Sequence, residues 1–397
     1  MAESSASALA VRVLQLVADG TPADAALREA LKRTRHRSAP AERRAVSQAI
    51  FAYFRWRQWL DARARPATQL AEAAELQARF DRSPTSFKSE ALAARAVPAW
   101  LSGMIDWPDR TADGILTGLE KAWHRQLQRE PALWLRVRRG REEAVGSELG
   151  SGLRAPGDAA FGAALAAPVA QVTSARLYAG GTDLFQTASF RAGDFEIQDL
   201  GSQVVGYACA PRPGETWWDA CAGEGGKLLH LADQMQNKGL IWASDRSERR
   251  LRQLKERAAR AQVFNYRMAA WDGSARLPTK TRFDGVLVDA PCSGIGTWQR
   301  NPHARWSTGP NDVKELAAVQ QRLLDHVAPS LKPGGRLVYA VCTLTRAETS
   351  EVAHAFANSH PDFEPVPTWP GASNDGTFLW PPVLNANGMF IACWRRK

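Results

Sequence analysis

The sequence predicts an α/β protein whose C-terminal part is a doubly wound parallel sheet and whose N-terminal part is all-helical. Two observations support this prediction. After about residue 191, short apolar runs alternate with glycine turns and helical patterns, as they do where helices cover both faces of a parallel sheet. Before residue 127, apolar residues recur at helical spacing instead. We therefore expect a helical domain over 1–127, a small α/β subdomain or linker over 128–190 and the doubly wound domain over 191–397.

The helical part begins with apolar residues at helical spacing over 9–17, and Gly20-Thr21-Pro22 then indicates a turn. Further helical patterns cover 25–31, 45–54, 68–80 and 89–104, with an interruption at Ser83-Pro84. The next segment has a different pattern. Residues 132–138 alternate as a strand does, residues 141–149 have a helical signal, and 150–190 are rich in Gly, Ala and Pro.

The C-terminal part contains the strand patterns of the predicted sheet. We expect strands at 216–219, 240–245, 263–269, 284–289, 336–342 and 389–394. Helical patterns over 228–235 and 247–260 connect the first of them. Because a helical crossover brings the next strand back in the same direction, this order predicts parallel pairing.

Composition narrows the class of protein. A chain of 397 residues predicts two or three domains, and 45% hydrophobic with 23% charged residues is typical of globular proteins. The sequence has no apolar run long enough for a bilayer and no signal-peptide pattern at its start. Five cysteines without a CxxC pair argue against a disulfide framework and a zinc site. We expect a cytoplasmic monomer with reduced thiols, no metal and no membrane partner.

The positive charge of the chain points to a polyanionic partner. Net charge is +10 and the sequence pI is about 9.7. We favour RNA binding by the basic clusters, with interleaved aromatic side chains stacking on unpaired bases. The alternative is a solvated helix face over an aromatic core. The basic clusters are Lys32, Arg33, Arg35, Arg37, Arg43, Arg44, Arg55, Arg57, Arg63 and Arg65, then Arg136, Arg138, Arg139 and Arg141; the aromatic residues are Phe51, Tyr53, Phe54, Trp56 and Trp59.

A glycine-rich turn after the first predicted strand indicates a nucleotide-type cofactor. Glycines let the backbone approach such a ligand, and Asp245, about 20 residues on, is placed to accept hydrogen bonds from ribose hydroxyls. Asp272 follows the third strand and is a candidate for the adenine amino group; Asp289 ends the fourth strand beside the same crevice. Asp219 is interpreted as a possible cap of the next helix. The turn, Gly223-x-Gly225-Gly226, is compatible with NAD, FAD or S-adenosylmethionine.

Two cysteines follow predicted strands at the edge where an α/β sheet carries its chemistry. Cys292 lies in Asp289-Ala290-Pro291-Cys292-Ser293-Gly294, and Cys342 lies in Tyr339-Ala340-Val341-Cys342-Thr343. A thiolate that adds to carbon 6 of a pyrimidine makes carbon 5 nucleophilic enough to accept a methyl group. Two thiols suit this chemistry, one to add and the other to help release. The residues alone do not say which thiol attacks.

These two motifs resemble the Nop/Sun-type RNA cytosine-5 methyltransferases. The resemblance covers roughly residues 131–397 and includes Lys332-Pro333-Gly334-Gly335 and the 219–227 turn. The N-terminal helices are similar to the NusB-like domain of the bacterial ribosomal RNA small-subunit methyltransferase B group. Departures from the family pattern are Glu224 in place of a proline, Leu228 in place of a threonine, His303 in place of an acid and Arg346 in place of a proline.

The resemblance implies a Rossmann-like class I methyltransferase domain and a small RNA-binding subdomain before it. It implies that Cys342 is the nucleophile, that Cys292 assists release and that Asp289 takes part in catalysis. The substrate would be RNA, most plausibly small-subunit ribosomal RNA. The residues that would hold S-adenosyl-L-methionine are Cys221, Ala222, Gly223, Glu224, Gly225, Gly226, Lys227, Asp245, Arg246, Asp272 and Asp289.

Other functions remain open from the sequence. One is cytosine-5 methylation of transfer RNA, and another is a non-catalytic RNA-binding factor for ribosome assembly, which would bind the cofactor without turnover. DNA cytosine-5 methylation is disfavoured. Those enzymes need a large recognition region after the core, and only about fifty residues follow Cys342.

Overall fold

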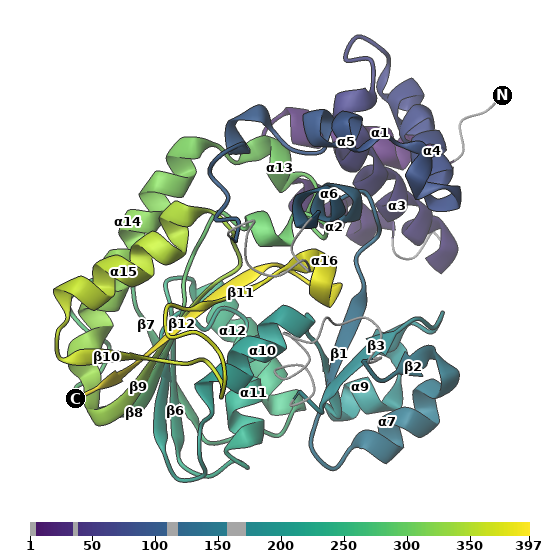
Figure 1. Ribbon diagram of the computed structural model, residues 1–397. Helices are drawn as coiled ribbons and strands as arrows, with labels where there is room; N and C mark the ends of the chain where they lie inside the picture. Colours follow the sequence, from purple (N-terminus) through teal and green to yellow (C-terminus); the bar gives the residue numbers. More distant parts are fainter. Residues whose placement is uncertain (1–4, 35–38, 109–117, 157–171) are drawn as a thin grey trace. The chain divides into compact units, whose positions relative to one another are not determined.

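The computed structural model describes residues 5–34, 39–108, 118–156 and 172–397, coloured along the chain in Figure 1. The chain forms two compact units. Unit 1 comprises Met1–Ser102, Arg110–Glu130 and Trp298–Thr308; unit 2 comprises Gly103–Asp109, Pro131–Thr297 and Gly309–Lys397. In the described part of the chain, no helix is long and apolar enough to cross a membrane.

Unit 1 is helical. Proline at the first position of two of its helices suits a helix start, because that residue needs no backbone N–H there. One apolar core lies between the first three helices, and a second, rich in aromatic rings, lies between α3, α4 and the 87–92 segment. The helices are α1 Ser5–Ala18, α2 Ala23–Thr34, α3 Pro40–Trp56, α4 Pro66–Arg82, α5 Ser89–Arg95, α6 Leu119–Gln126 and the short α13 Ala304–Ser307.

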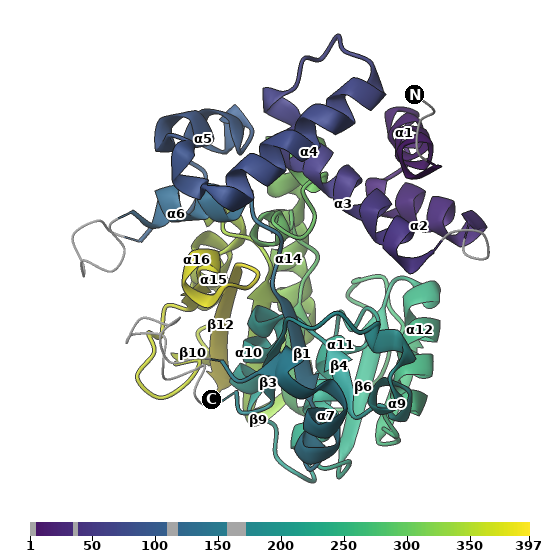
Figure 2. The same cartoon turned by 90° about the vertical axis from the view of Figure 1, so that its right-hand side faces the viewer.

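Unit 2 begins with a small antiparallel sheet in the order β2-β3-β1-β4. Two short helices accompany it, and its own apolar core includes Leu135, Val145 and Phe195. Figure 2 shows this sheet beside two helices that cover the larger sheet, α11 Gly226–Gln234 and α12 Glu248–Arg260. The elements are β1 Leu133–Val137, α7 Glu142–Leu149, β2 Leu153–Arg154, β3 Ala175–Tyr178, α9 Ala188–Ala192 and β4 Phe195–Ile197.

The rest of unit 2 is an eight-stranded sheet in the order β10-β12-β9-β8-β5-β6-β7, with β11 paired to β12. Strands β5 to β9 pair in parallel, and β5 lies between β6 and β8. The strands are β5 Thr216–Asp219, β6 Leu240–Asp245, β7 Tyr266–Ala270, β8 Phe283–Asp289, β9 Leu331–Val341, β10 Phe363–Val366, β11 Thr377–Leu379 and β12 Met389–Arg396.

Helices cover both faces of this sheet, as Figure 1 shows. Successive side chains of a strand point to opposite faces, so Trp217 belongs to one core and Trp218 to the other. Asp199 caps α10 and Ser247 caps α12, each through its side-chain oxygen. Helices α10 Leu200–Cys209, α11 Gly226–Gln234 and α12 Glu248–Arg260 pack on one face, and α14 Pro310–Val327 and α15 Ser350–Ser359 on the other; α16 is Pro381–Leu384.

One expectation about the fold needs correction. The sheet is not wholly parallel, because β12 runs antiparallel to β9, β10 and β11. A strand's apolar pattern carries no direction, and β12 follows β10 and β11 without the long helical crossover that returns a strand in parallel. Residues 298–308 group with unit 1 in the structure. The expected domain boundaries remain a prediction.

Candidate active site

A cavity of about 590 Å³ opens at the C-terminal ends of β5, β6, β8 and β9. This is the crevice where the strand order reverses on either side of β5, the usual ligand position in such sheets. Every residue that the sequence predicted for the site lines the cavity except Gly225, which shapes the turn beside it. The structure adds Asp219 and an apolar wall formed by Trp271, Leu316, Val319 and Leu323.

The glycine turn between β5 and α11 needs two left-handed backbone conformations. Gly223 has φ +54° and Gly225 has φ +83°, and a Cβ at Gly225 would lie 2.7 Å from Cγ of Leu254. The N–H of Gly223 donates to Oδ2 of Asp245 at 3.0 Å. The turn is therefore anchored to the end of β6 and directs the first residues of α11 into the cavity.

Three of the four aspartates that line the cavity, Asp219, Asp245 and Asp272, differ in their surroundings. Asp245 is buried and accepts from the N–H of Ser247 at 2.8 Å as well as from Gly223. Asp272 is exposed, and its hydrogen bond from Ser274 lowers its pKa. Asp219 is buried, and neither of its carboxylate oxygens has a hydrogen-bond partner in the described residues. It caps no helix, since Gly225 occupies the N-cap of α11.

Burial is the main cause that raises the pKa of Asp219 to about 7, and the charge of Asp289 adds to it. The fourth acid, Asp289, pairs with Lys227, whose Nζ lies 2.6 Å from Asp289 Oδ2. Burial works to lower the pKa of Lys227, but the charge and hydrogen bond of Asp289 outweigh it and raise that pKa. The site thus holds a fixed ion pair next to a carboxyl group that can carry a proton near neutral pH.

The two cysteines lie side by side. Strands β8 and β9 are adjacent and parallel, with Asp289 opposite Ala340, so the loops that follow them begin at the same level. The Sγ atoms of Cys292 and Cys342 are 3.3 Å apart, and both thiols are free. The contact with Cys342, followed by burial, raises the pKa of Cys292 well above its ordinary value.

The other thiols have different surroundings. Cys209 and Cys393 are buried in the core beside the sheet, which fits a structural rather than a catalytic role. Cys221 lines the cavity and packs against apolar neighbours, and burial strongly raises its pKa. A raised pKa keeps Cys221 in the thiol form near neutral pH, so it is a wall residue rather than a nucleophile.

Sequence reasoning gave Glu348 no role in the site. This residue is fully buried and accepts hydrogen bonds from the loops that carry both cysteines. Nothing in the periodicity around it indicates burial, because Thr345-Arg346-Ala347-Glu348 reads as a polar loop. The one feature of the sequence that could have indicated a role for Glu348 is its chemistry: it is a carboxylate six residues after Cys342, among residues with hydroxyl side chains.

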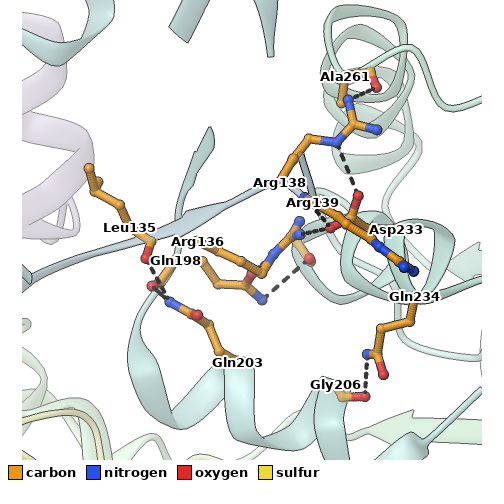
Figure 3. A network of polar contacts seen from close by, with 11 residues as sticks. Leu135, Arg136, Arg138, Arg139, Gln198, Gln203, Gly206, Asp233, Gln234 and Ala261 are labelled. Carbon is orange, nitrogen blue, oxygen red and sulfur yellow. Dashed lines mark hydrogen bonds and ion pairs between the residues drawn. The ribbon is translucent and has the colours of Figure 1, made fainter. Parts of the chain in front are cut away.

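Two members of the basic cluster over 136–141, Arg136 and Arg138, pair with an acidic residue of α11, whereas the side chains of Arg139 and Arg141 are exposed. Figure 3 shows Arg136, Arg138 and the backbone of Arg139 converging on Asp233 of α11. Arg136 is fully buried and donates its Nε to Gln198 Oε1 at 2.7 Å. Burial lowers the pKa of Arg136, partly offset by the charge of Asp233. Arg136 therefore joins β1 to α11 and cannot contact RNA phosphates in this structure.

The N-terminal aromatic residues are also mostly structural. Phe54 and Trp56 are buried, and Trp56 packs against Phe80 and Phe87, so the stacking role expected for Phe54 and Trp56 is wrong. Arg55 is buried as well and bonds to Gln77. Arg35 and Arg37 lie outside the described residues. Of the basic residues predicted to contact RNA in unit 1, the exposed ones are Lys32, Arg33, Arg44, Arg57, Arg63 and Arg65, and Arg33 also pairs with Glu29.

Comparison with known proteins finds similarity over the larger domain. Residues 206–395 match the family model of the 16S rRNA methyltransferases RsmB/F. The chain is 37% identical over 222 residues to a probable ribosomal RNA small subunit methyltransferase B of Bacillus subtilis (strain 168), which covers 53% of this chain and 50% of that protein. It spans about half the length of that relative and of its Synechocystis counterpart.

Two solved structures share the fold. PH0851 has a TM-score of 0.77 with 23% identity, over the full length of both chains. NSun6 from Pyrococcus horikoshii, solved with SFG, has a TM-score of 0.56 with 21% identity over 70% of this chain and 94% of that one. The Rossmann-like architecture expected from the sequence is confirmed by these likenesses; they do not name the helical unit.

Proposed function

We propose that this chain, whose residues 206–395 match the model of the RsmB/F family of 16S rRNA methyltransferases, methylates carbon 5 of a cytosine in small-subunit ribosomal RNA. The observation that carries the proposal is the pair of free thiols 3.3 Å apart at the ends of two adjacent parallel strands. The Lys227–Asp289 ion pair and the cofactor cavity adjoin them.

The cavity fits S-adenosylmethionine. Its volume of about 590 Å³ lies within the usual range for small-molecule sites, ~300–1,000 Å³. Asp245 ends β6 where ribose hydroxyls need acceptors, and Asp272 with the wall of Trp271 and Leu323 suits an adenine ring. The unpaired carboxylate of Asp219 faces the cavity, where a cationic ligand group would compensate it. NSun6 was solved with SFG, an S-adenosylmethionine analogue.

The reaction begins at Cys342. Its thiolate adds to carbon 6 of the cytosine, and the electron pair displaced from the ring double bond makes carbon 5 nucleophilic. S-adenosylmethionine, when bound, supplies the methyl group as a sulfonium. A base then takes the proton from carbon 5, the ring double bond re-forms, the bond from Sγ to carbon 6 breaks, and the thiolate of Cys342 returns.

The other side chains of the site would stabilise charge or transfer protons during the reaction. Lys227 interacts favourably with a charge on Cys342 and stabilises the thiolate. Asp289 pairs with Lys227, and in the form that carries a proton it would donate a hydrogen bond to nitrogen 3 of the ring during addition. Cys292 touches Cys342 and assists the release step. The target base must leave its stack, at a cost of a few kcal/mol, to reach this pair.

Transfer of a labelled methyl group tests the proposal. Wild type, Cys342→Ala and the control Cys209→Ala, a buried thiol outside the cavity, are incubated with labelled S-adenosylmethionine and undermethylated small-subunit RNA. We expect labelled 5-methylcytidine with wild type and the control and none with Cys342→Ala. Label in transfer RNA alone would move the substrate to that class. Cofactor binding without transfer to RNA or to ribosomal particles would favour the assembly-factor alternative.

A further inference from the structure

Glu348, which the mechanism above leaves unused, lies against both cysteine loops. It is completely buried in the turn after β9. Its Oε1 accepts from the backbone N–H of Ser293 at 2.9 Å and from Nε2 of Gln320 at 3.0 Å. Its Oε2 lies 2.5 Å from Ser293 Oγ, 3.2 Å from Thr343 Oγ1 and 2.9 Å from Thr345 Oγ1. One carboxylate therefore collects five donors.

These contacts tie the two loops together. Ser293 directly follows Cys292, and Thr343 directly follows Cys342. Their hydroxyl oxygens are 2.8 Å apart, and both lie beside the same oxygen of Glu348. A displacement of either loop would break hydrogen bonds to a buried carboxylate, which is costly, so the two loops hold one relative position.

Neighbouring side chains prevent Glu348 itself from moving. Gln320 of α14 also donates to the carbonyl oxygen of Pro291, the residue before Cys292, at 2.9 Å. The hydroxyl of Tyr339 donates to the backbone oxygen of Glu348 at 2.7 Å and lies 3.0 Å from Oε1 of Gln320. The carboxylate is thus fixed from the sheet and from the helix that covers it.

The charge of Glu348 acts on Cys292. All five donors are neutral, so they satisfy the carboxylate without cancelling its charge. That charge joins the Cys342 contact and burial in raising the pKa of Cys292. Lys227, which pairs with Asp289, carries a positive charge that interacts with Cys342.

We propose that Glu348 is a positioning residue that fixes the two cysteine loops against each other and so holds Sγ of Cys292 in contact with Sγ of Cys342. The inference rests on the proposed function for the roles of the thiols.

The test compares Glu348→Gln with Glu351→Gln, an exposed carboxylate three residues later that serves as the matched control. Cofactor-free protein is alkylated with iodoacetamide across a pH series, and the extent at Cys292 and at Cys342 is read by peptide mass spectrometry. Loss of the negative charge should move the alkylation profile of Cys292 to lower pH. Methyl transfer at saturating RNA should fall about 100-fold, as expected when a reacting group is misplaced by about 1 Å.

Binding of S-adenosylmethionine, measured by calorimetry, should be unchanged in both variants. Thr345→Val, which removes one of the five donors, should give smaller changes in the same direction and serves if Glu348→Gln does not fold. An unshifted Cys292 profile, or a loss of methyl transfer matched by an equal loss of cofactor binding, would overturn the inference. A shifted profile in a protein whose wild type transfers no methyl group would instead support the Glu348 inference and refute the proposed function.

Discussion

Replacing Asp219 with asparagine should change how stability depends on pH. The folded chain raises the pKa of Asp219 from 3.8 to about 7, chiefly through burial. Because the folded state holds this proton more tightly than the unfolded state, ionisation works against folding. Each pKa unit corresponds to about 1.4 kcal/mol, so the full effect is about 4 kcal/mol.

The sign of the effect follows from the raised pKa. The contribution of Asp219 to stability is fully present below pH 3.8 and is lost as the pH rises through about 7. Of the total, about 2.5 kcal/mol is lost between pH 5 and pH 8. Asparagine has nearly the same size and does not ionise, so the variant should lack this loss.

Urea unfolding of cofactor-free protein, followed by tryptophan fluorescence at pH 5 and pH 8, measures the difference. Relative to Asp219→Asn, the free energy of unfolding of wild type should fall by about 2.5 kcal/mol between the two pH values. Asp272→Asn is the control, because Asp272 is an exposed acid on the same cavity. Equal pH dependence of wild type and Asp219→Asn would refute the reasoning.

Two further substitutions test the turn and unit 1. Gly225→Ala should unfold at a lower urea concentration than Gly214→Ala. Both glycines have positive φ, but only at Gly225 would the new Cβ meet Leu254. Equal loss of stability in the two variants would contradict this close approach. Arg305→Ala should lower the free energy of unfolding of unit 1, measured by calorimetry, by roughly 3 kcal/mol or more. The reason is that the buried guanidinium donates to three backbone carbonyls. The exposed control Arg44→Ala should cause no such loss.

The thiol pair could be foreseen from sequence because its position depends only on strand order. Cys292 and Cys342 each follow an apolar run, and parallel strands end at one edge, so the two were expected near one cofactor turn. The 3.3 Å contact required one more fact, that β8 and β9 are neighbours with Asp289 opposite Ala340. Sequence pattern does not fix register.

The destinations of charged side chains could not be foreseen in the same way. The sequence around Arg136 indicates a basic surface cluster, but the side chain is buried, where it pairs with Asp233, 97 residues away, and donates to Gln198. The pattern around Glu348 indicates a loop acid, but the side chain is buried, and three of its five donors come from Ser293 and Gln320, which are 55 and 28 residues away. For a long polar side chain, burial depends on tertiary partners that local composition does not reveal.

The central claim is that Cys342 forms the covalent bond to cytosine while Cys292 is needed to break it. We would incubate Cys292→Ala with S-adenosylmethionine and undermethylated small-subunit RNA, digest protein and RNA, and locate the modified peptide by mass spectrometry, with Cys209→Ala as control. We expect a methylated cytidine on Cys342 in the Cys292→Ala protein and none in the control. An adduct on another residue, or methylation by Cys292→Ala at the wild-type rate with no adduct, would contradict it.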